Sequence, residues 1–309
     1  MRIKLASLSR DWSVIASLFL VDALLLLTSD FRLVWRSECG ILVSAFILTS
    51  IAQFYSRFRH APRLANMAET GCLLILFTNA AVVFNYIMAG ILPLPLWDAS
   101  FDVADKAFGL DWMSLFRWVA AHPAIYTGSN IVYFALAPEL IFLLLLLEGL
   151  GRRGQATELR RCFVASALIT IFFGILMPAA GPFVFYHLPI AQTTAYVAQE
   201  AALRNGALRL IDLANAEGLV AFPSFHAALA ILCAYAARSL KYLTVPVLLL
   251  NILIVISSPV IGGHYYVDIF AGLILAAAVI AVERRLTSRD AAESTRSFAS
   301  LPFRRSARV

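Results

Sequence analysis

Three ionisable side chains in apolar stretches are the strongest chemical signal in the sequence: His226, His264 and Asp268. Such side chains inside a membrane are costly and by default suggest function. His264 and Asp268 are four residues apart, a spacing that puts both on one face of a helix. An imidazole oriented by a carboxylate, with a second imidazole to move protons, suits acid–base and nucleophilic catalysis. The same three residue types could instead bind zinc.

The residues before each histidine favour an anion as the ligand. Pro223 suits the first position of a helix, which would leave the backbone amides of Ser224, Phe225 and His226 without intrahelical acceptors. Gly262 and Gly263 precede His264 and allow close backbone approach. Because helix N-termini attract anions, two of them facing one cavity predict a phosphate site.

The elements that must position these residues are membrane helices. The chain of 309 residues is 61% hydrophobic and 14% charged, which excludes a soluble globular protein. We predict an all-α, polytopic membrane helical bundle, because lipid forces spanning segments to be helical. Eight segments are predicted to cross the membrane, near 13–28, 40–56, 70–94, 129–149, 162–185, 218–237, 243–258 and 264–282.

The basic residues predict the orientation of these spans. Alternate connecting segments hold 19 of the 25 Lys and Arg residues, and the opposite segments hold six. Because Lys and Arg collect on the cytoplasmic side, both termini are expected there. The spans that carry His226 and His264 then both begin outside, so we expect one site that faces the exterior or periplasm. The net charge of +6 reflects this distribution and does not indicate a nucleic-acid partner.

The spans divide the chain into three parts. Residues 1–69 are expected to form two extra N-terminal transmembrane helices, 70–285 a six-helix catalytic core, and 286–309 a basic, disordered cytoplasmic tail. The two long outer loops, 95–128 and 186–217, interleave apolar and charged residues at helical spacing, which predicts amphipathic interfacial helices.

Two motifs resemble the signatures of a known family. They read Phe-Pro-Ser-Phe-His-Ala-Ala from residue 222 and Gly-His-Tyr-Tyr-Val-Asp-Ile-Phe-Ala-Gly from residue 263. They resemble the second and third motifs of the type 2 phosphatidic acid phosphatase superfamily, and within it the branch that contains inositol phosphorylceramide synthase. Phe225 replaces the usual Gly, Ser258 replaces the usual Arg, and no K-x6-R-P motif is found. Arg204 and Arg209 are candidate substitutes for the missing cations.

The resemblance implies phosphoryl transfer on a lipid, without a metal or other cofactor. His264 would form a phosphohistidine, Asp268 would orient it, and His226 would serve as acid and base. Ser224, the free amides beside it and Gly263 would bind phosphate oxygens. The acceptor, water or a lipid alcohol, stays open. Two alternatives also remain at this point: a polytopic transporter, and an intramembrane zinc hydrolase that uses the same three side chains.

Overall fold

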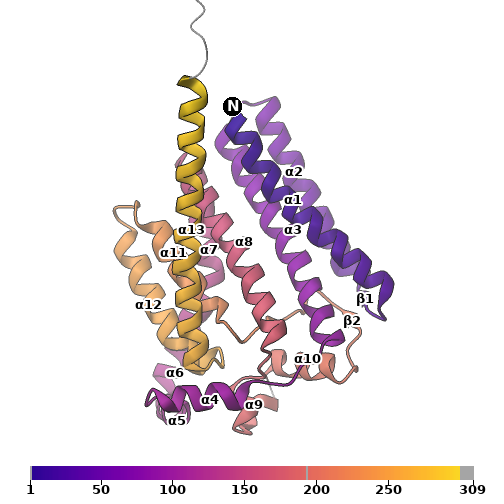
Figure 1. The fold of residues 1–309 in the computed structure, drawn as a ribbon, viewed down its shortest axis with the longest axis vertical. Helices are drawn as coiled ribbons and strands as arrows, with labels where there is room; N and C mark the ends of the chain where they lie inside the picture. The colour runs from indigo at the N-terminus through magenta and orange to yellow at the C-terminus, as the bar shows by residue number, and fades with distance from the viewer. Residues whose placement is uncertain (1, 193, 300–309) are drawn as a thin grey trace, which may run out of the picture.

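The computed structural model describes residues 2–192 and 194–299, and these form a bundle of long helices (Figure 1). Among the described residues, seven helical segments are long and apolar enough to cross a membrane, which confirms the predicted polytopic all-α class. They are α1 (Arg2–Thr28), α2 (Trp35–Arg57), α3 (Pro62–Ile91), α6 (Pro123–Phe134) continued by α7 (Leu136–Gly149), α8 (Arg153–Leu176), α12 (Thr244–Ile261) and α13 (Tyr266–Ala299).

The predicted span 218–237 is shorter than expected. Its helix, α11 (Phe225–Ala237), has 13 residues, or about 20 Å at 1.5 Å per residue, against about 30 Å of hydrocarbon. The chain before it is non-helical, and Ser224 is the N-cap of the helix. Pro223 was predicted as the first helical residue, but it lies outside the helix. The Phe222–Pro223 peptide bond is cis.

Helix α11 lies in the core of the bundle. It packs against α7, α8, α12 and α13, and eight of its 13 residues are buried, five of them Ala. Gly272 of α13 permits the closest approach, since a Cβ atom at this position would lie 2.3 Å from the carbonyl oxygen of Ser224. The start of α11 is thereby held against the first turns of α13.

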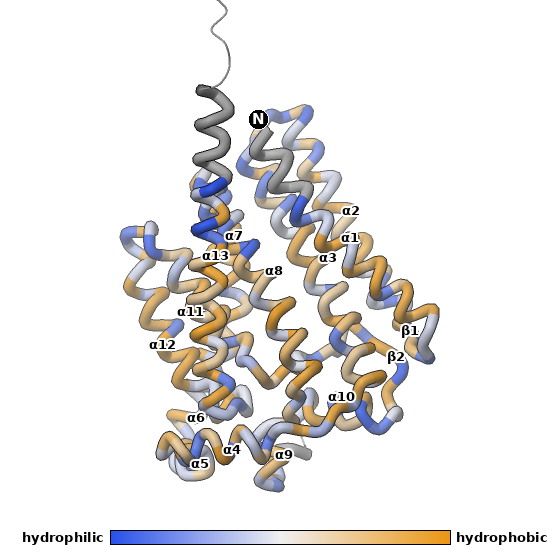
Figure 2. The backbone as a smooth tube through the Cα atoms, viewed as in Figure 1, coloured by the Kyte–Doolittle hydropathy of each residue, from blue (hydrophilic) through white to orange (hydrophobic). Residues whose placement is uncertain are grey.

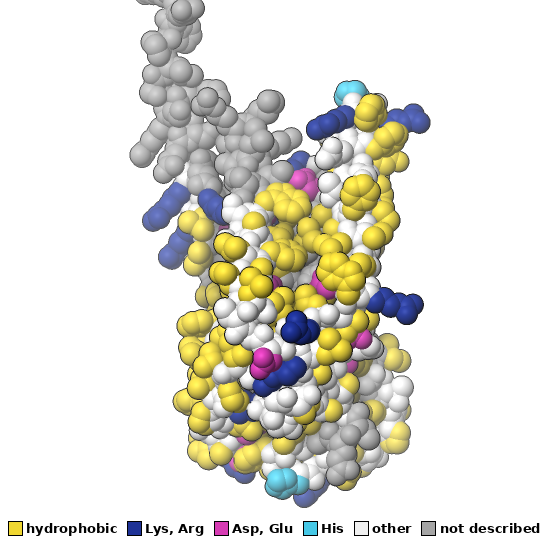
Figure 3. All heavy atoms as spheres, turned by 90° about the vertical axis from the view of Figure 1, so that its right-hand side faces the viewer, with side chains coloured by type: hydrophobic (Ala, Val, Ile, Leu, Met, Phe, Trp, Pro, Cys, Tyr) yellow, Lys and Arg dark blue, Asp and Glu magenta, His cyan; other side chains and the backbone are white. Residues whose placement is uncertain are grey.

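The outer surface of the bundle is apolar. Hydrophobic residues extend along the long helices in Figure 2, and hydrophobic side chains are spread over the face seen in Figure 3. Phe46 of α2 and Leu27 of α1 are among the exposed ones. A water-facing surface would not carry so much apolar area, so this face suits lipid.

One end of the bundle is closed by short elements, and we call it the loop end (Figure 1). It holds α4 (Asp98–Ala107), α5 (Trp112–Ala120), α9 (Pro182–Phe185), the 3-10 helix Pro189–Gln192 and α10 (Ala195–Arg204). Two short strands, β1 (Arg32–Leu33) and β2 (Leu210–Ile211), pair in parallel there. Both long loops thus contain the short helices predicted for them.

The boundaries of the expected parts differ from the observed elements in two places. Helices α1 and α2 lie within residues 1–69, but α3 already begins at Pro62. Helix α13 continues to Ala299, through a segment predicted as disordered tail, because the Ala, Glu and Arg residues there favour helix. Residues 300–309 of that tail lie outside the described residues.

Candidate active site

His264 and Asp268 lie together at the loop end. The prediction that both residues lie on one helical face is wrong, because His264 precedes α13. They meet across the bend that begins the helix, with 3.6 Å between His264 Nδ1 and Asp268 Oδ2. The same Oδ2 accepts a hydrogen bond of 2.9 Å from the backbone amide of Tyr265, which fixes the carboxylate. Burial lowers the pKa of His264 to about 4, so its imidazole is neutral at pH 7.

His226 reaches the same place from the second position of α11. Its ring stacks on Tyr133 of α6, with 4.3 Å between ring centroids and 11° between planes. A Cβ atom at Gly262 would lie 2.6 Å from the Tyr133 hydroxyl and 2.8 Å from Cδ2 of His264. Tyr133 therefore bridges His226 and the chain that carries His264.

Ser224 joins the two helix starts. Its backbone amide donates to the carbonyl of Asp268 at 2.9 Å, and its hydroxyl oxygen accepts from the amide of Ala227 at 3.3 Å. The amide of Ser224 is thus occupied, contrary to the sequence-based expectation. Among the described residues, the amides of Phe225 and His226 have no hydrogen-bond acceptor, so the expected anion-binding groups at this helix start are these two.

Carboxylates cap the backbone amides at the start of α13. Asp105 of α4 accepts hydrogen bonds of 2.8 Å from the amides of both Tyr266 and Val267, while Asp268 holds the amide of Tyr265. These three amides are the ones that a phosphate would have used. The expectation of two free helix N-termini is therefore wrong for the second one, because acidic side chains cap it.

A second aspartate of α4 holds the neighbouring turn. Asp98 accepts from the amides of Ala180 and Gly181, at 3.0 and 2.8 Å, and from the Tyr265 hydroxyl at 3.0 Å. Gly181 has a φ of +88°, and a Cβ atom there would lie 2.9 Å from the carbonyl of Gly263. Burial raises the pKa of Asp98 and of Asp105, and the hydrogen bonds they accept oppose that rise.

Helix α4 buries its acidic side. Asp98, Asp102 and Asp105 are 2–7% exposed, whereas Val103 and Phe108 are 66% and 76% exposed. An amphipathic helix was predicted here, but these three acids were not predicted as site residues. Their spacing, four and then three residues, was the available signal, since it puts them in one stripe.

Tyr196 of α10 is a further group that sequence reasoning did not select. Its hydroxyl is buried and has no hydrogen-bond partner among the described residues. A Cβ atom at Gly263 would lie 2.5 Å from this hydroxyl, and one at Gly181 would lie 3.4 Å from it. Gly263 has a φ of +63°, so both backbone conformation and space require glycine at this position.

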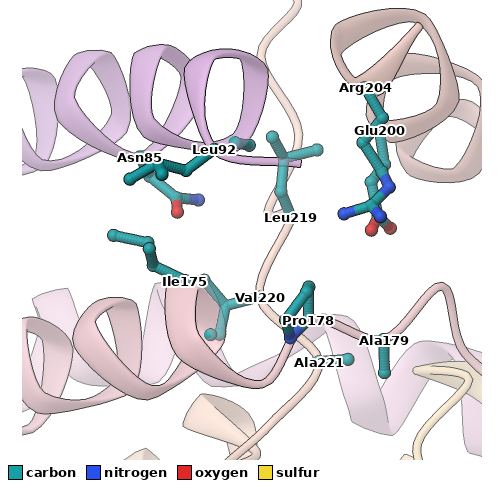
Figure 4. Close-up of a pocket in the computed structure, with 12 residues that line it drawn as sticks. Asn85, Leu92, Ile175, Pro178, Ala179, Glu200, Arg204, Leu219, Val220 and Ala221 are labelled. Carbon is teal, nitrogen blue, oxygen red and sulfur yellow. The ribbon is translucent and has the colours of Figure 1, made fainter. Parts of the chain in front are cut away.

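The two candidate arginines occupy different surroundings. Arg204 donates to the carbonyl of Leu94 at 2.6 Å and lines a cavity of about 30 Å³ together with Glu200 and Asn85 (Figure 4). Val220 and Ala221, just ahead of the Ser224 segment, line the same cavity. Arg209 instead lies over the ring of Phe31, 4.7 Å from its centroid.

The alternative of a zinc site gains no support from the described residues. They contain no group of three or more His, Cys, Asp or Glu side chains placed to hold a metal ion. Asp268 Oδ2 is engaged with Tyr265, and Tyr133 covers one face of His226.

Comparison with protein families gives one result. Residues 100–282 match the family model described as the PAP2 superfamily, a range that contains His226, His264, Asp268, Tyr133 and Tyr196 but not Asp98. Comparisons with curated proteins and with solved structures give no match. The matched region spans more than half of the chain and includes both histidines and the aspartate, and the protein therefore belongs to the PAP2 superfamily.

Proposed function

We propose that this protein is a membrane phosphotransferase or phosphatase that acts on a phospholipid or lipid phosphate through a phosphohistidine. Membership of the superfamily supports a phosphatase-type enzyme. The observation that carries the finer proposal is the meeting of His264, Asp268 and His226 at one end of a membrane bundle. The apolar surface around that bundle suits a substrate that arrives from lipid.

In the proposed first step, Nε2 of His264 attacks phosphorus and the bond to the leaving oxygen breaks. Asp268 accepts the Nδ1 hydrogen, which orients the ring and stabilises its positive charge. The 3.6 Å separation is long for a hydrogen bond, and such contacts commonly shorten in the substrate complex. His226 acts in its protonated form: it gives that proton to the leaving alcohol and becomes neutral, ready to serve as the base of the second step.

In the second step, His226 removes a proton from the acceptor, whose oxygen attacks phosphorus and releases His264. Water as acceptor gives hydrolysis, and a lipid alcohol gives transfer. The Phe225 and Ser258 departures from the phosphatase motifs favour transfer, because they resemble the inositol phosphorylceramide synthase branch.

Phosphate oxygens would bind at the free amides of α11, at the hydroxyl of Ser224 and at the backbone of Gly263. Arg204 can attract the phosphate from the adjoining cavity. We assign no phosphate contact to Arg209, because its guanidinium packs on Phe31.

We also propose that the loop end faces the exterior or periplasm and that both termini are cytoplasmic. The distribution of Lys and Arg supports this orientation, since 19 of 25 lie in segments assigned to the opposite side.

A product screen tests the proposed function. Purified protein in detergent is given phosphatidic acid, phosphatidylinositol and ceramide, and free phosphate and new phospholipids are both measured. We expect turnover by the native chain and by His122→Ala, an exposed histidine on the same end, but none by His264→Ala. Label from the phosphate donor should appear on His264 as an acid-labile adduct. Full turnover by His264→Ala would overturn the phosphohistidine mechanism.

A further inference from the structure

Two tyrosine hydroxyls flank the backbone that leads into His264. Tyr133 lies against Gly262 and Tyr196 against Gly263, each so close that a Cβ atom at the glycine would be 2.6 and 2.5 Å from the hydroxyl. The two phenols are near enough to interact electrostatically. They come from α6 and α10, so the fold brings them together from separate elements.

The Tyr196 hydroxyl is buried and has no hydrogen-bond partner in the described part of the chain. A buried hydroxyl without a partner is destabilising, and native structures rarely leave one so without a reason. Its neighbours in the site are the backbone of Gly181 and Gly263, whose approach requires glycine at both positions. A ligand oxygen at this place would give the hydroxyl its missing acceptor.

The charged groups around the site are mostly acidic. Glu200, Asp98 and Asp268 all act on Tyr196 electrostatically, and Asp105 lies at the start of α13. Lys106 of α4 is ion-paired with Asp102 at 2.7 Å, and its side chain is 55% exposed. Arg204 is tied to a backbone carbonyl beside Glu200. No described cation therefore stands in direct contact with the two histidines, and the direct donors must be neutral.

We propose that Tyr133 and Tyr196 are catalytic residues whose hydroxyls donate hydrogen bonds to the phosphoryl oxygens. This inference rests on the proposed function. The hydroxyls make and break no covalent bond: phosphorus passes from the leaving oxygen to His264 and then to the acceptor, and His226 carries the proton. The tyrosines stabilise the charge that develops on the equatorial oxygens, the task that cations perform in other phosphoryl-transfer sites.

The ionisation of Tyr196 agrees with a role as donor. Burial, with smaller contributions from Glu200, Asp98 and Asp268, raises its pKa above the ordinary value of 10. The hydroxyl therefore keeps its proton over the whole range in which the enzyme would work. Its removal should change the rate at every pH by the same factor, without moving the limbs of the pH profile.

The test compares Tyr196→Phe and Tyr133→Phe with Tyr235→Phe. Each change removes one hydroxyl and keeps the ring, so the stacking of residue 133 on His226 is retained. Tyr235 is the matched control, because its hydroxyl donates to Glu158 at 2.9 Å, away from the loop end. We expect kcat to fall about 100-fold in each site variant, with KM changed less than about threefold, since the loss of one such donor costs 10²–10³ in kcat.

A second measurement is independent of turnover. Orthovanadate resembles the transition state of phosphoryl transfer, and its binding is followed by the rise in unfolding temperature of the purified protein. We expect both site variants to bind vanadate at least about tenfold more weakly than the native chain and Tyr235→Phe. A Tyr196→Phe protein with native kcat and native vanadate affinity would overturn the inference. If His264→Ala keeps full turnover, the proposed function fails instead, so the two failures are distinguishable.

Discussion

Asp105 offers the sharpest test of how the loop end positions the site. Its carboxylate accepts two hydrogen bonds of 2.8 Å from the first amides of α13, next to the turn that holds Asp268. A hydrogen bond to a charged group contributes about 1.5–3 kcal/mol, so Asp105→Ala removes about 3–6 kcal/mol of interaction and leaves two amides without acceptors. Asp105→Asn keeps one oxygen acceptor but turns an amide N–H toward a backbone N–H, so we expect about half of that loss.

The assay is thermal unfolding of the purified protein in detergent, with activity measured below the transition. Asp111→Ala is the control, because this aspartate also caps a helix but is exposed and accepts one backbone bond, from Met113 at 3.1 Å. Loss of such a cap costs about 1 kcal/mol. We expect the drop in unfolding temperature to be largest for Asp105→Ala, smaller for Asp105→Asn and smallest for Asp111→Ala. We expect kcat to fall only in the Asp105 variants. Equal effects of Asp105→Ala and Asp111→Ala would refute the reasoning.

Four further predictions concern the same site and its orientation. Asp268→Asn should bind substrate normally but lose roughly a few orders of magnitude in kcat, and a loss below tenfold would contradict the orienting role. The folded pKa of His264, about 4, lies below its unfolded value of 6.5, so the unfolded state takes up the proton first. Stability is then complete above pH 6.5 and falls by about 3 kcal/mol as the pH drops to 4, a loss that His264→Gln should not show in pH-dependent unfolding. Gly272→Ala should lower both stability and activity, because its Cβ would lie 2.3 Å from the Ser224 carbonyl and separate α11 from α13; unchanged unfolding would contradict this packing. In a cysteine-free background, Lys106→Cys should react with an impermeant thiol reagent from outside intact cells and Lys241→Cys only after lysis, and the reverse pattern would invert the proposed orientation.

The sequence alone was enough to select His226, His264 and Asp268 as a group, for a physical reason. A lipid environment makes any ionisable side chain costly, so the few that occur in apolar stretches are informative. The order of the spans then placed all three side chains at the same depth of the membrane. The structure brings the same three side chains together, although His264 precedes its helix and meets Asp268 across a bend.

Other features could not be predicted because they depend on partners distant in the chain. Tyr133 and Tyr196 are residue types that membrane proteins place at interfaces for unrelated reasons, so neither stands out in the sequence. The role of Asp105 depends on a partner 161 residues away, at Tyr266. Local reasoning also assigned Pro223 to the helix, whereas the packing of Ser224 against Asp268 starts α11 two residues later.

The capping of α13 and the choice of donors are two parts of one arrangement. An uncapped helix N-terminus would itself attract the phosphate, with the partial positive charge of its free amides. Here Asp105 and Asp268 occupy those amides and add negative charge beside the place that we propose for the phosphoryl group. The start of α11 then supplies two amides that have no acceptor among the described residues, those of Phe225 and His226. With the hydroxyl of Ser224 and the backbone of Gly263 they are the donors proposed above, and the phenol of Tyr196, which lacks an acceptor among the described residues, is the further neutral donor that we propose. In the proposed mechanism, Asp268 can orient His264 only if the other donors are neutral, because a cation at that distance would pair with Asp268 and release His264 from it.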